Sequence, residues 1–177
     1  DGVKISREIE TKIEKVLATE LMPVPTSKLG KALRFDESGD RYIEFCKSTV
    51  PSEVSFSSLR IVIDCANGAC YKVTPSVFRE LGAEVIEMAT NPDGFNINNK
   101  CGSTHPEALA KEVIKQRADY GLAMDGDGDR VVLVDSKGNL LDGDDILYIL
   151  AFSNPNRTGA WSGIVAVSYT HLTLPTS

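Results

Sequence analysis

The start of the chain has the spacing of an amphipathic helix. Apolar residues recur every three or four positions between Ile9 and Leu17, and Ser6 is a suitable N-cap, so we expect a helix over residues 6–21. Two prolines that follow are expected to end this helix. The elements expected after it are a turn at residues 36–40, a short helix over residues 41–49 and a linker over residues 51–58.

Beyond residue 58, short apolar runs alternate with helical patterns. The runs expected to form strands are residues 59–64, 83–89, 120–124 and 131–135. The helices expected between them cover residues 75–81 and 104–117, and one more helix is expected after residues 142–144, through residue 152. This alternation predicts an α/β fold, a layered α/β/α domain with a mixed, mainly parallel sheet. The last two strands follow each other closely, so antiparallel pairing is expected at that edge.

Local signals mark the ends of two of these helices. Gly82 is expected to close the helix before it at the C′ position. Thr104 and Glu107 predict a capping box, in which each side chain satisfies a free backbone amide. His105 lies inside this box, so we expect it to serve the helix start rather than act as a base. The residues expected to face the core from that helix are Leu109, Val113 and Ile114.

Charge and cysteine content exclude several classes of protein. The chain has 177 residues with 19 Lys and Arg against 25 Asp and Glu, and an acidic surface of this kind repels nucleic-acid phosphate. No apolar run approaches the ~20 residues that cross a bilayer. The four cysteines form no CxxC pair, which favours reduced thiols in a cytoplasmic protein over a zinc site or a disulfide framework. The first residues fit neither an initiator Met nor a signal peptide, so a cut end is expected.

One loop carries the candidate chemistry. Asp125, Asp127 and Asp129 alternate with glycines, which lets three carboxylates converge on one point. At ~4 Å and an effective dielectric constant of ~20, each carboxylate pair repels by about 4 kcal/mol, and a hard divalent cation removes that cost. A solvated acidic turn is the plain alternative. An EF-hand is excluded, because Arg130 stands where that loop needs Gly and Ser136 where it needs Glu.

Arg130 has two possible roles that the sequence leaves open. Its guanidinium could bind a phosphate, or it could form an ion pair that orients an aspartate. Three-acid metal sites leave coordination positions for phosphate oxygens, which suits phosphoryl transfer. No Walker P-loop is present, and with only His105 and His171 available no Ser/His/Asp triad is visible.

At this loop the chain resembles the α-D-phosphohexomutase superfamily, whose metal-binding signature is DGDGDR. The segments that narrow the resemblance to the bacterial phosphoglucosamine mutase branch are residues 41–47, 63–69, 96–98, 101–107 and 141–144. A phosphomannomutase or phosphoglucomutase relative is the nearest alternative. The resemblance extends from residue 1 to about residue 166.

The resemblance implies a cytoplasmic enzyme that interconverts glucosamine 6-phosphate and glucosamine 1-phosphate for amino-sugar nucleotide and cell-wall precursor synthesis. It implies an enzyme phosphoserine, a 1,6-bisphosphate intermediate and a phosphosugar as the partner. By motif position, Asp125, Asp127 and Asp129 would bind Mg²⁺ and Arg130 would lie beside the phosphate. The family's phosphoserine loop precedes the segment that Asp1 matches, so no catalytic nucleophile is assigned here, and residues 1–177 alone are expected to be inactive.

The resemblance also implies a division of the chain into one domain with partial flanking domains. Residues 1–57 would be the end of a first domain plus a linker, residues 58–158 the second, metal-binding domain, and residues 159–166 the first strand of a third. Residues 167–177 do not follow the family and are expected to be a foreign tail. The sequence indicates neither the sugar preference nor the oligomeric state.

Two other functions stay open at this point. One is a non-catalytic module that binds a structural divalent ion, which calcium binding stronger than magnesium binding would favour. The other is a phosphatase-like hydrolase in which Asp125 itself is the nucleophile, because the aspartate follows the end of a strand. Phosphorylation of Asp125 by a phosphodonor would favour that reading.

Overall fold

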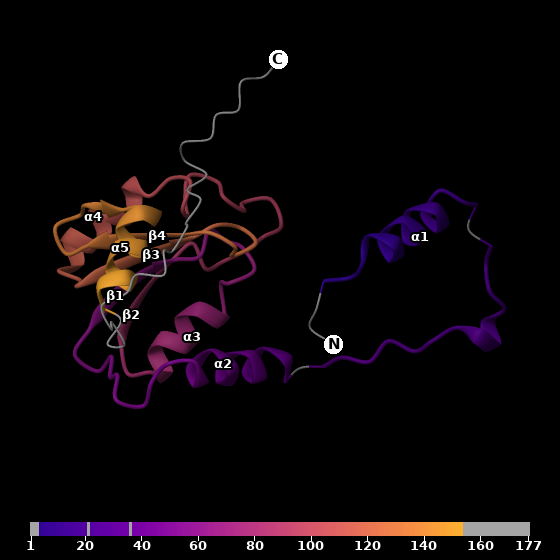
Figure 1. The fold of residues 1–177 in the computed structure, drawn as a ribbon, viewed down its shortest axis with the longest axis horizontal. Helices are drawn as coiled ribbons and strands as arrows, with labels where there is room; N and C mark the ends of the chain where they lie inside the picture. Colours follow the sequence, from indigo (N-terminus) through magenta and orange to yellow (C-terminus); the bar gives the residue numbers. More distant parts are fainter. Residues whose placement is uncertain (1–3, 21, 36, 154–177) are drawn as a thin grey trace, which may run out of the picture. The chain divides into compact units, whose positions relative to one another are not determined.

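The computed structural model describes residues 4–20, 22–35 and 37–153. Contacts between Cα atoms divide the chain into two units, Asp1–Asp36 and Glu37–Ser177. The first unit contains helix α1 (Arg7–Leu17) and a short 3₁₀ helix, η1 (Thr26–Lys28). The second unit contains the sheet and the remaining helices, and it carries the candidate site (Figure 1).

Helix α1 confirms the predicted start but ends earlier than expected. The Ser6 hydroxyl oxygen accepts a hydrogen bond from the backbone N–H of Ile9 at 3.4 Å, as an N-cap does. The helix stops at Leu17, well before the two prolines. Thr19 is the reason, because its hydroxyl and its backbone N–H both donate to the Val16 carbonyl and close the last turn.

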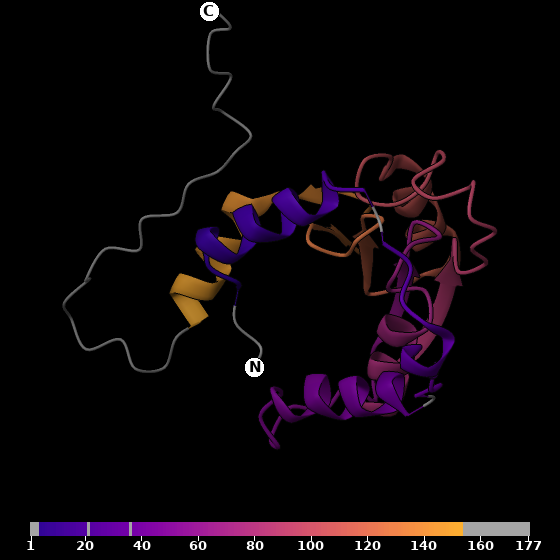
Figure 2. The ribbon, with the colours of Figure 1, turned by 90° about the vertical axis from the view of Figure 1, so that its right-hand side faces the viewer.

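Helix α2 (Ser38–Ser48) begins inside the segment expected to be a turn, so that part of the prediction was wrong. The Glu37 side chain pairs with Arg41 one turn later at 3.0 Å, and Asp40 lies in the first turn, where a negative charge suits the helix dipole. Helix α2 lies beside α3 (Val73–Glu80) (Figure 2). Lys47 joins the two helices through a 2.6 Å ion pair with Glu80.

The expected linker over residues 51–58 contains no helix or strand, yet one of its side chains belongs to the core. Phe56 packs against Phe78 of α3 in an edge-on contact, with the ring centroids 5.7 Å apart. The segment is therefore anchored to the sheet by an aromatic pair.

The four predicted strands form, and a fifth joins them. The strands are β1 (Arg60–Asp64), β2 (Glu84–Met88), β3 (Tyr120–Met124), β4 (Val131–Asp135) and β5 (Leu140–Leu141), in the spatial order β2-β1-β3-β4-β5. Strand β1 pairs in parallel with β2 and β3, whereas β4 pairs antiparallel with β3 and β5. One strand of the five therefore runs opposite to the others, which confirms the mixed, mainly parallel sheet with antiparallel pairing at one edge.

Helices cover both faces of this sheet, as the α/β/α prediction required. On one face, Val62, Ala123 and Val134 form a buried cluster with Leu109 and Val113 of α4 (Glu107–Gln116). On the other face, Ile61 and Ile63 cluster with Phe78 of α3 and with Phe56. Alternate residues of β1 thus enter two separate cores, because successive side chains of a strand point to opposite faces.

Helix α4 corrects two details of the sequence analysis. The capping box does not form: Pro106 is the N-cap without a side-chain hydrogen bond, and His105 donates its N–H to the Gly102 carbonyl at 3.0 Å, so residues 102–105 make a turn of their own. Leu109 and Val113 are fully buried as expected, but Ile114 is 55% exposed because it lies one position beyond the buried stripe.

Helix ends elsewhere follow backbone and side-chain capping rules. Gly82 has φ +101° and donates its N–H to Arg79, which confirms the predicted C′ glycine after α3. Helix α5 (Gly143–Ser153) is capped by Asp142, whose carboxylate accepts the N–H groups of Asp144 and Asp145. The Asp145 carboxylate in turn accepts the N–H of Asp142 at 3.1 Å. The reciprocal cap therefore forms at α5 rather than at α4.

Several predictions fall outside what the structure describes. Residues 159–166, residues 167–177 and His171 lie beyond the described ranges. The proposed boundaries at residues 57 and 158 stay predictions. Within the described residues, no helix combines the length and the apolar character that a membrane span requires.

We expect Leu109→Ala to lower the free energy of unfolding by about 2–5 kcal/mol, because it leaves a cavity under α4 in a fully buried cluster. Lys111→Ala, on the exposed side of the same helix, is the control and should change it by less than about 0.5 kcal/mol. Urea unfolding followed by circular dichroism measures both. Equal, small effects would contradict the assignment of Leu109 to the core.

Candidate metal centre

The acidic loop lies at the carboxyl edge of the sheet. Residues 125–130 connect β3 to β4, and the segments that follow β1 and β2 leave the sheet at the same edge because these three strands run parallel. Ligands of α/β proteins bind outside the carboxyl ends of the strands, where such loops meet. The position of the loop in the fold thus agrees with a binding site.

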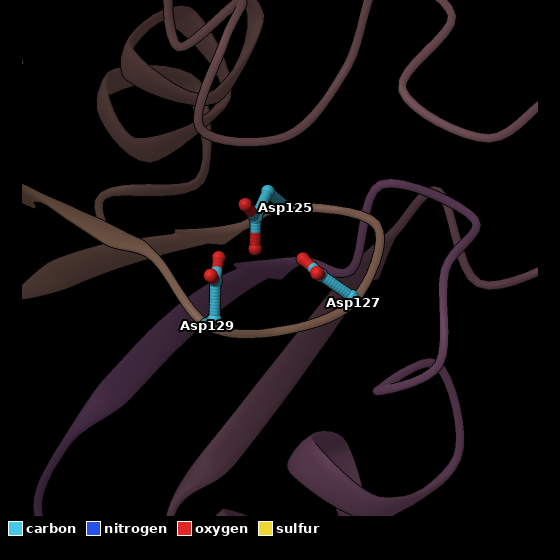
Figure 3. A group of neighbouring side chains, drawn as sticks. All are labelled: Asp125, Asp127 and Asp129. Atoms are coloured by element: carbon cyan, nitrogen blue, oxygen red, sulfur yellow. The ribbon is translucent and has the colours of Figure 1, made fainter. Parts of the chain in front are cut away.

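The structure brings the three sequence-predicted carboxylates together. One oxygen from each of Asp125, Asp127 and Asp129 lies within 4.8 Å of the others. Figure 3 shows the three side chains pointing toward one another from around the loop. Asp125 is buried, whereas Asp127 and Asp129 are exposed. The donor set consists only of carboxylate oxygens, which is the chemistry that Mg²⁺ and Ca²⁺ prefer.

Arg130 forms the ion pair that the sequence analysis offered as one of its two roles. Its Nε lies 2.9 Å from Asp125 Oδ2 and 3.5 Å from Asp129 Oδ1. The backbone N–H of Arg130 also donates to Asp125 Oδ1 at 3.1 Å, so both oxygens of the Asp125 carboxylate are engaged. The guanidinium side chain is 74% exposed, so solvent screens its end of the pair, whereas the Asp125 side chain is only 4% exposed. The pair orients Asp125 more than it stabilises the fold.

The pKa values of Asp125 and Asp129 shift in opposite directions. For Asp125, burial opposes ionisation, but the hydrogen bond from the Arg130 backbone, the hydrogen bond with Asp129 and the Arg130 charge together lower its pKa. For Asp129, the hydrogen bond with Asp125 and the charge of Asp127 raise its pKa. As the pH falls, Asp129 therefore takes up a proton before Asp125 does, and this protonation reduces the repulsion between the two carboxylates.

Two glycines of the loop are required by their surroundings. A Cβ at Gly126 would lie 2.6 Å from the Ile97 side chain and 2.8 Å from Asn98 Nδ2. Gly128 has φ +75°, which side-chain-bearing residues rarely adopt, and a Cβ there would collide with the Cys70 sulfur. Close packing by neighbouring loops therefore sets the path of the acidic loop.

Those neighbours include residues that the sequence analysis missed. Asn98 has φ +55° and a buried Oδ1 without a hydrogen-bond partner, and its Nδ2 lies against Gly126. Asn67 also has a positive φ, and its side-chain amide both donates to Asn96 and accepts from the N–H of Asn91. The available signal was the asparagines themselves, one in the loop after β1 and several after β2, because Asn tolerates the left-handed conformation that tight loops need.

The cysteines and His105 are not among the converging ligands, although the Cys70 sulfur packs against Gly128 of the acidic loop. Cys65 and Cys101 are buried, Cys46 and Cys70 are half-buried, and all four thiols are free. Burial raises the pKa of Cys65 to about 12, so it is an inert thiol at neutral pH. Among the described residues, the acidic group is the one cluster of His, Cys, Asp or Glu with metal-ligand spacing. His105 is exposed beside α4 and makes its hydrogen bond through the backbone.

The family model for phosphoglucomutase/phosphomannomutase, alpha/beta/alpha domain II, matches residues 40–138, which is more than half of the chain. The chain belongs to this family. The match includes the whole acidic loop and the three parallel strands that lead to this edge.

Most of the chain is similar in sequence to proteins named phosphoglucosamine mutase. The protein of that name from Legionella pneumophila (strain Paris) is 54% identical over 165 residues, covering 93% of this chain and 36% of the relative. That from Aeromonas hydrophila is 57% identical over 151 residues, covering 85% and 34%. These matches confirm the resemblance to that branch. The chain spans about a third of the length of the curated relatives it matches.

A solved structure supports the fold. The crystal structure of a phosphoglucomutase/phosphomannomutase family protein from Burkholderia thailandensis matches with a TM-score of 0.54 and 30% sequence identity, covering 64% of this chain and 25% of that one. The α/β architecture of the sheet and its helices is thus the architecture of a phosphohexomutase.

We expect Asp129→Asn to stabilise the protein at pH 7 in the presence of a chelator, because it removes a charge that its neighbours disfavour. The folded-state pKa of Asp129 is raised, so its ionised form weakens the fold at neutral pH, and that penalty disappears as the pH falls through the raised pKa. The gain of the variant over the wild type in urea midpoint should therefore shrink toward pH 3.

Asp144→Asn is the matched control for this experiment, since it changes the net charge equally at an exposed position outside the acidic loop. A gain shared by both variants would show a general charge effect instead of local crowding. A loss of stability in Asp129→Asn alone would contradict the description of the loop.

Proposed function

We propose that Asp125, Asp127 and Asp129 bind one Mg²⁺ and that the chain is the metal-binding part of a phosphoglucosamine mutase. The observation that carries this proposal is the convergence of three carboxylates within 4.8 Å at the carboxyl edge of the sheet. The identity to phosphoglucosamine mutases over most of the chain supports the choice of branch. The reaction proposed is the interconversion of glucosamine 6-phosphate and glucosamine 1-phosphate through a phosphoserine and a 1,6-bisphosphate.

Each loop residue has a distinct part in this proposal. When bound, Mg²⁺ withdraws charge from the transferring phosphoryl group and helps to hold it in line. Asp125 is the buried ligand, held in place by the Arg130 backbone, and Asp127 and Asp129 face solvent, where a phosphorylated partner can approach. The exposed Arg130 guanidinium pairs with Asp125 and Asp129 in this structure, and with those carboxylates on a cation its planar donors would be available to a phosphate oxygen.

The identity to phosphoglucosamine mutases favours this role for Asp125 over that of a nucleophile. One of its carboxylate oxygens accepts the Arg130 N–H, the other contacts Arg130 Nε, and the side chain is only 4% exposed. A nucleophilic carboxylate needs a free oxygen in line with the phosphorus atom. Because Arg130 engages both oxygens in this structure, either role for Asp125 would require the Arg130 side chain to move aside.

Localisation and domain division belong to the same proposal. The similarity to bacterial metabolic enzymes named phosphoglucosamine mutase supports a cytoplasmic protein. The division proposed is an end of a first domain with its linker at residues 1–57, the metal-binding domain at residues 58–158 and the first strand of a third domain at residues 159–166.

We expect Asp127→Asn to weaken Mg²⁺ binding at least roughly tenfold, because the change removes one of three ligand charges, and even outer residues of metal sites matter to that extent. Titration calorimetry on residues 1–177 measures the affinity, and Asp144→Asn, an equal charge change away from the loop, should bind as the wild type does. Unchanged binding by Asp127→Asn would contradict the site. Calcium binding much stronger than magnesium binding would favour the structural-ion alternative.

We expect residues 1–177 to convert no glucosamine 6-phosphate, even with Mg²⁺ and the bisphosphate added, because phosphoryl transfer needs a donor group as well as charge stabilisation. In a full-length enzyme that carries this segment, Asp125→Ala should lower kcat by about 100-fold or more, while Asp144→Asn keeps it. A coupled assay for glucosamine 1-phosphate measures both. Turnover by residues 1–177, with a phosphorylated Asp125, would favour the hydrolase-type chemistry instead.

A further inference from the structure

We propose that Asp64 is a positioning residue for the metal ligands. It acts through two loops that form hydrogen bonds with the backbone on either side of Asp125. This inference rests on the proposed function, because it concerns the same metal site. Asp64 is the last residue of β1 and is fully buried, and the resemblance to the family assigned it no part. A buried carboxylate is costly unless its charge is compensated, so its presence there requires an explanation.

Both oxygens of Asp64 accept backbone hydrogen bonds, and they come from different loops. Oδ1 accepts the N–H of Ala66 at 2.9 Å, in the loop that follows β1. Oδ2 accepts the N–H of Gly102 at 2.8 Å, in the loop that leads from β2 to α4. The donors lie 36 residues apart in the chain (102 − 66) and meet on one side chain. The carboxylate thus ties the two loops together.

Each of these loops then holds the acidic loop by one backbone hydrogen bond. Ala69 donates its N–H to the Gly126 carbonyl, and Ser103 donates its N–H to the Met124 carbonyl, both at 2.8 Å. The two accepting carbonyls belong to the residues on either side of Asp125. The first metal ligand therefore lies between two anchor points that depend on Asp64.

Close backbone packing makes these anchors sensitive to small shifts. A Cβ at Gly68 would collide with the Gly126 backbone, and one at Gly102 would lie 2.5 Å from the Met124 carbonyl oxygen. Ala66 and Gly102 both have positive φ values, +53° and +73°, so neither donor is held by regular secondary structure. The Asp64 carboxylate supplies the fixed acceptors that keep both N–H groups in place.

An asparagine cannot replace Asp64 in this role, since its amide offers one acceptor oxygen and places N–H₂ against the other donor. We expect Asp64→Asn to weaken Mg²⁺ binding by about 10–100-fold, the range seen when outer residues of metal sites are changed. Titration calorimetry with Mg²⁺ measures the affinity. The electron paramagnetic resonance spectrum of bound Mn²⁺ reports whether the ligand geometry has changed.

The matched control is Asp119→Asn at the opposite end of the sheet. Asp119 Oδ2 accepts the N–H of Arg60 at 2.8 Å, so this variant also removes a carboxylate-to-backbone hydrogen bond, but far from the loop. It should lower the thermal midpoint while changing the Mg²⁺ affinity less than twofold and leaving the Mn²⁺ spectrum unaltered. A purely structural role for Asp64 would give Asp64→Asn the same behaviour as this control, and it would overturn the inference.

Amide hydrogen exchange on the wild type gives a second test that does not require a variant to fold. Addition of Mg²⁺ should slow the exchange of the Ala69 and Ser103 amides, whose acceptors flank Asp125, and leave the Arg60 amide unchanged. Unchanged exchange at Ala69 and Ser103 would overturn the coupling. Absence of Mg²⁺ binding by the wild type would refute the proposed metal site itself, whereas equal binding by wild type and Asp64→Asn would refute only the role of Asp64.

Discussion

Repulsion between three carboxylates is the constraint on which the rest of this structure depends. One carboxylate oxygen from each of Asp125, Asp127 and Asp129 lies within 4.8 Å of the others, and like charges at this spacing repel one another. In this protein the opposing features are the Arg130 side chain at the loop's end, its backbone N–H on Asp125, and backbone anchors on both sides of the first aspartate. The fold maintains a concentration of negative charge that is ready for a cation.

The parallel sheet makes that arrangement possible. Strands β1, β2 and β3 end at one edge, so loops from distant parts of the chain lie side by side there. Two buried clusters, one under α3 and one under α4, fix the strands from both faces. Their rigidity allows a few backbone hydrogen bonds at the edge to set the position of the acidic loop.

Most of the same sheet lies within the region that the family model matches. The matched region, residues 40–138, contains both clusters, all the parallel strands and the acidic loop. Lys47 of α2 forms an ion pair with Glu80 of α3, and Phe56 packs against Phe78 of α3. The segment before β1 therefore contributes to this unit as well. A single folded unit therefore carries the proposed ligands.

The sequence by itself determined the elements whose signals are local. Alternation of apolar and polar residues located four strands, Gly82 marked a helix end, and the spacing of three aspartates identified the candidate site, because each of these depends on neighbours a few residues away. The tertiary structure alone decided the rest. It left the Ile114 side chain 55% exposed, and it made Pro106 rather than Thr104 the N-cap of α4. It also brought the N–H groups of Ala66 and Gly102 to the two oxygens of Asp64. These outcomes depend on contacts between segments far apart in the chain, and the folding of the sheet, not the local pattern, brings those segments together.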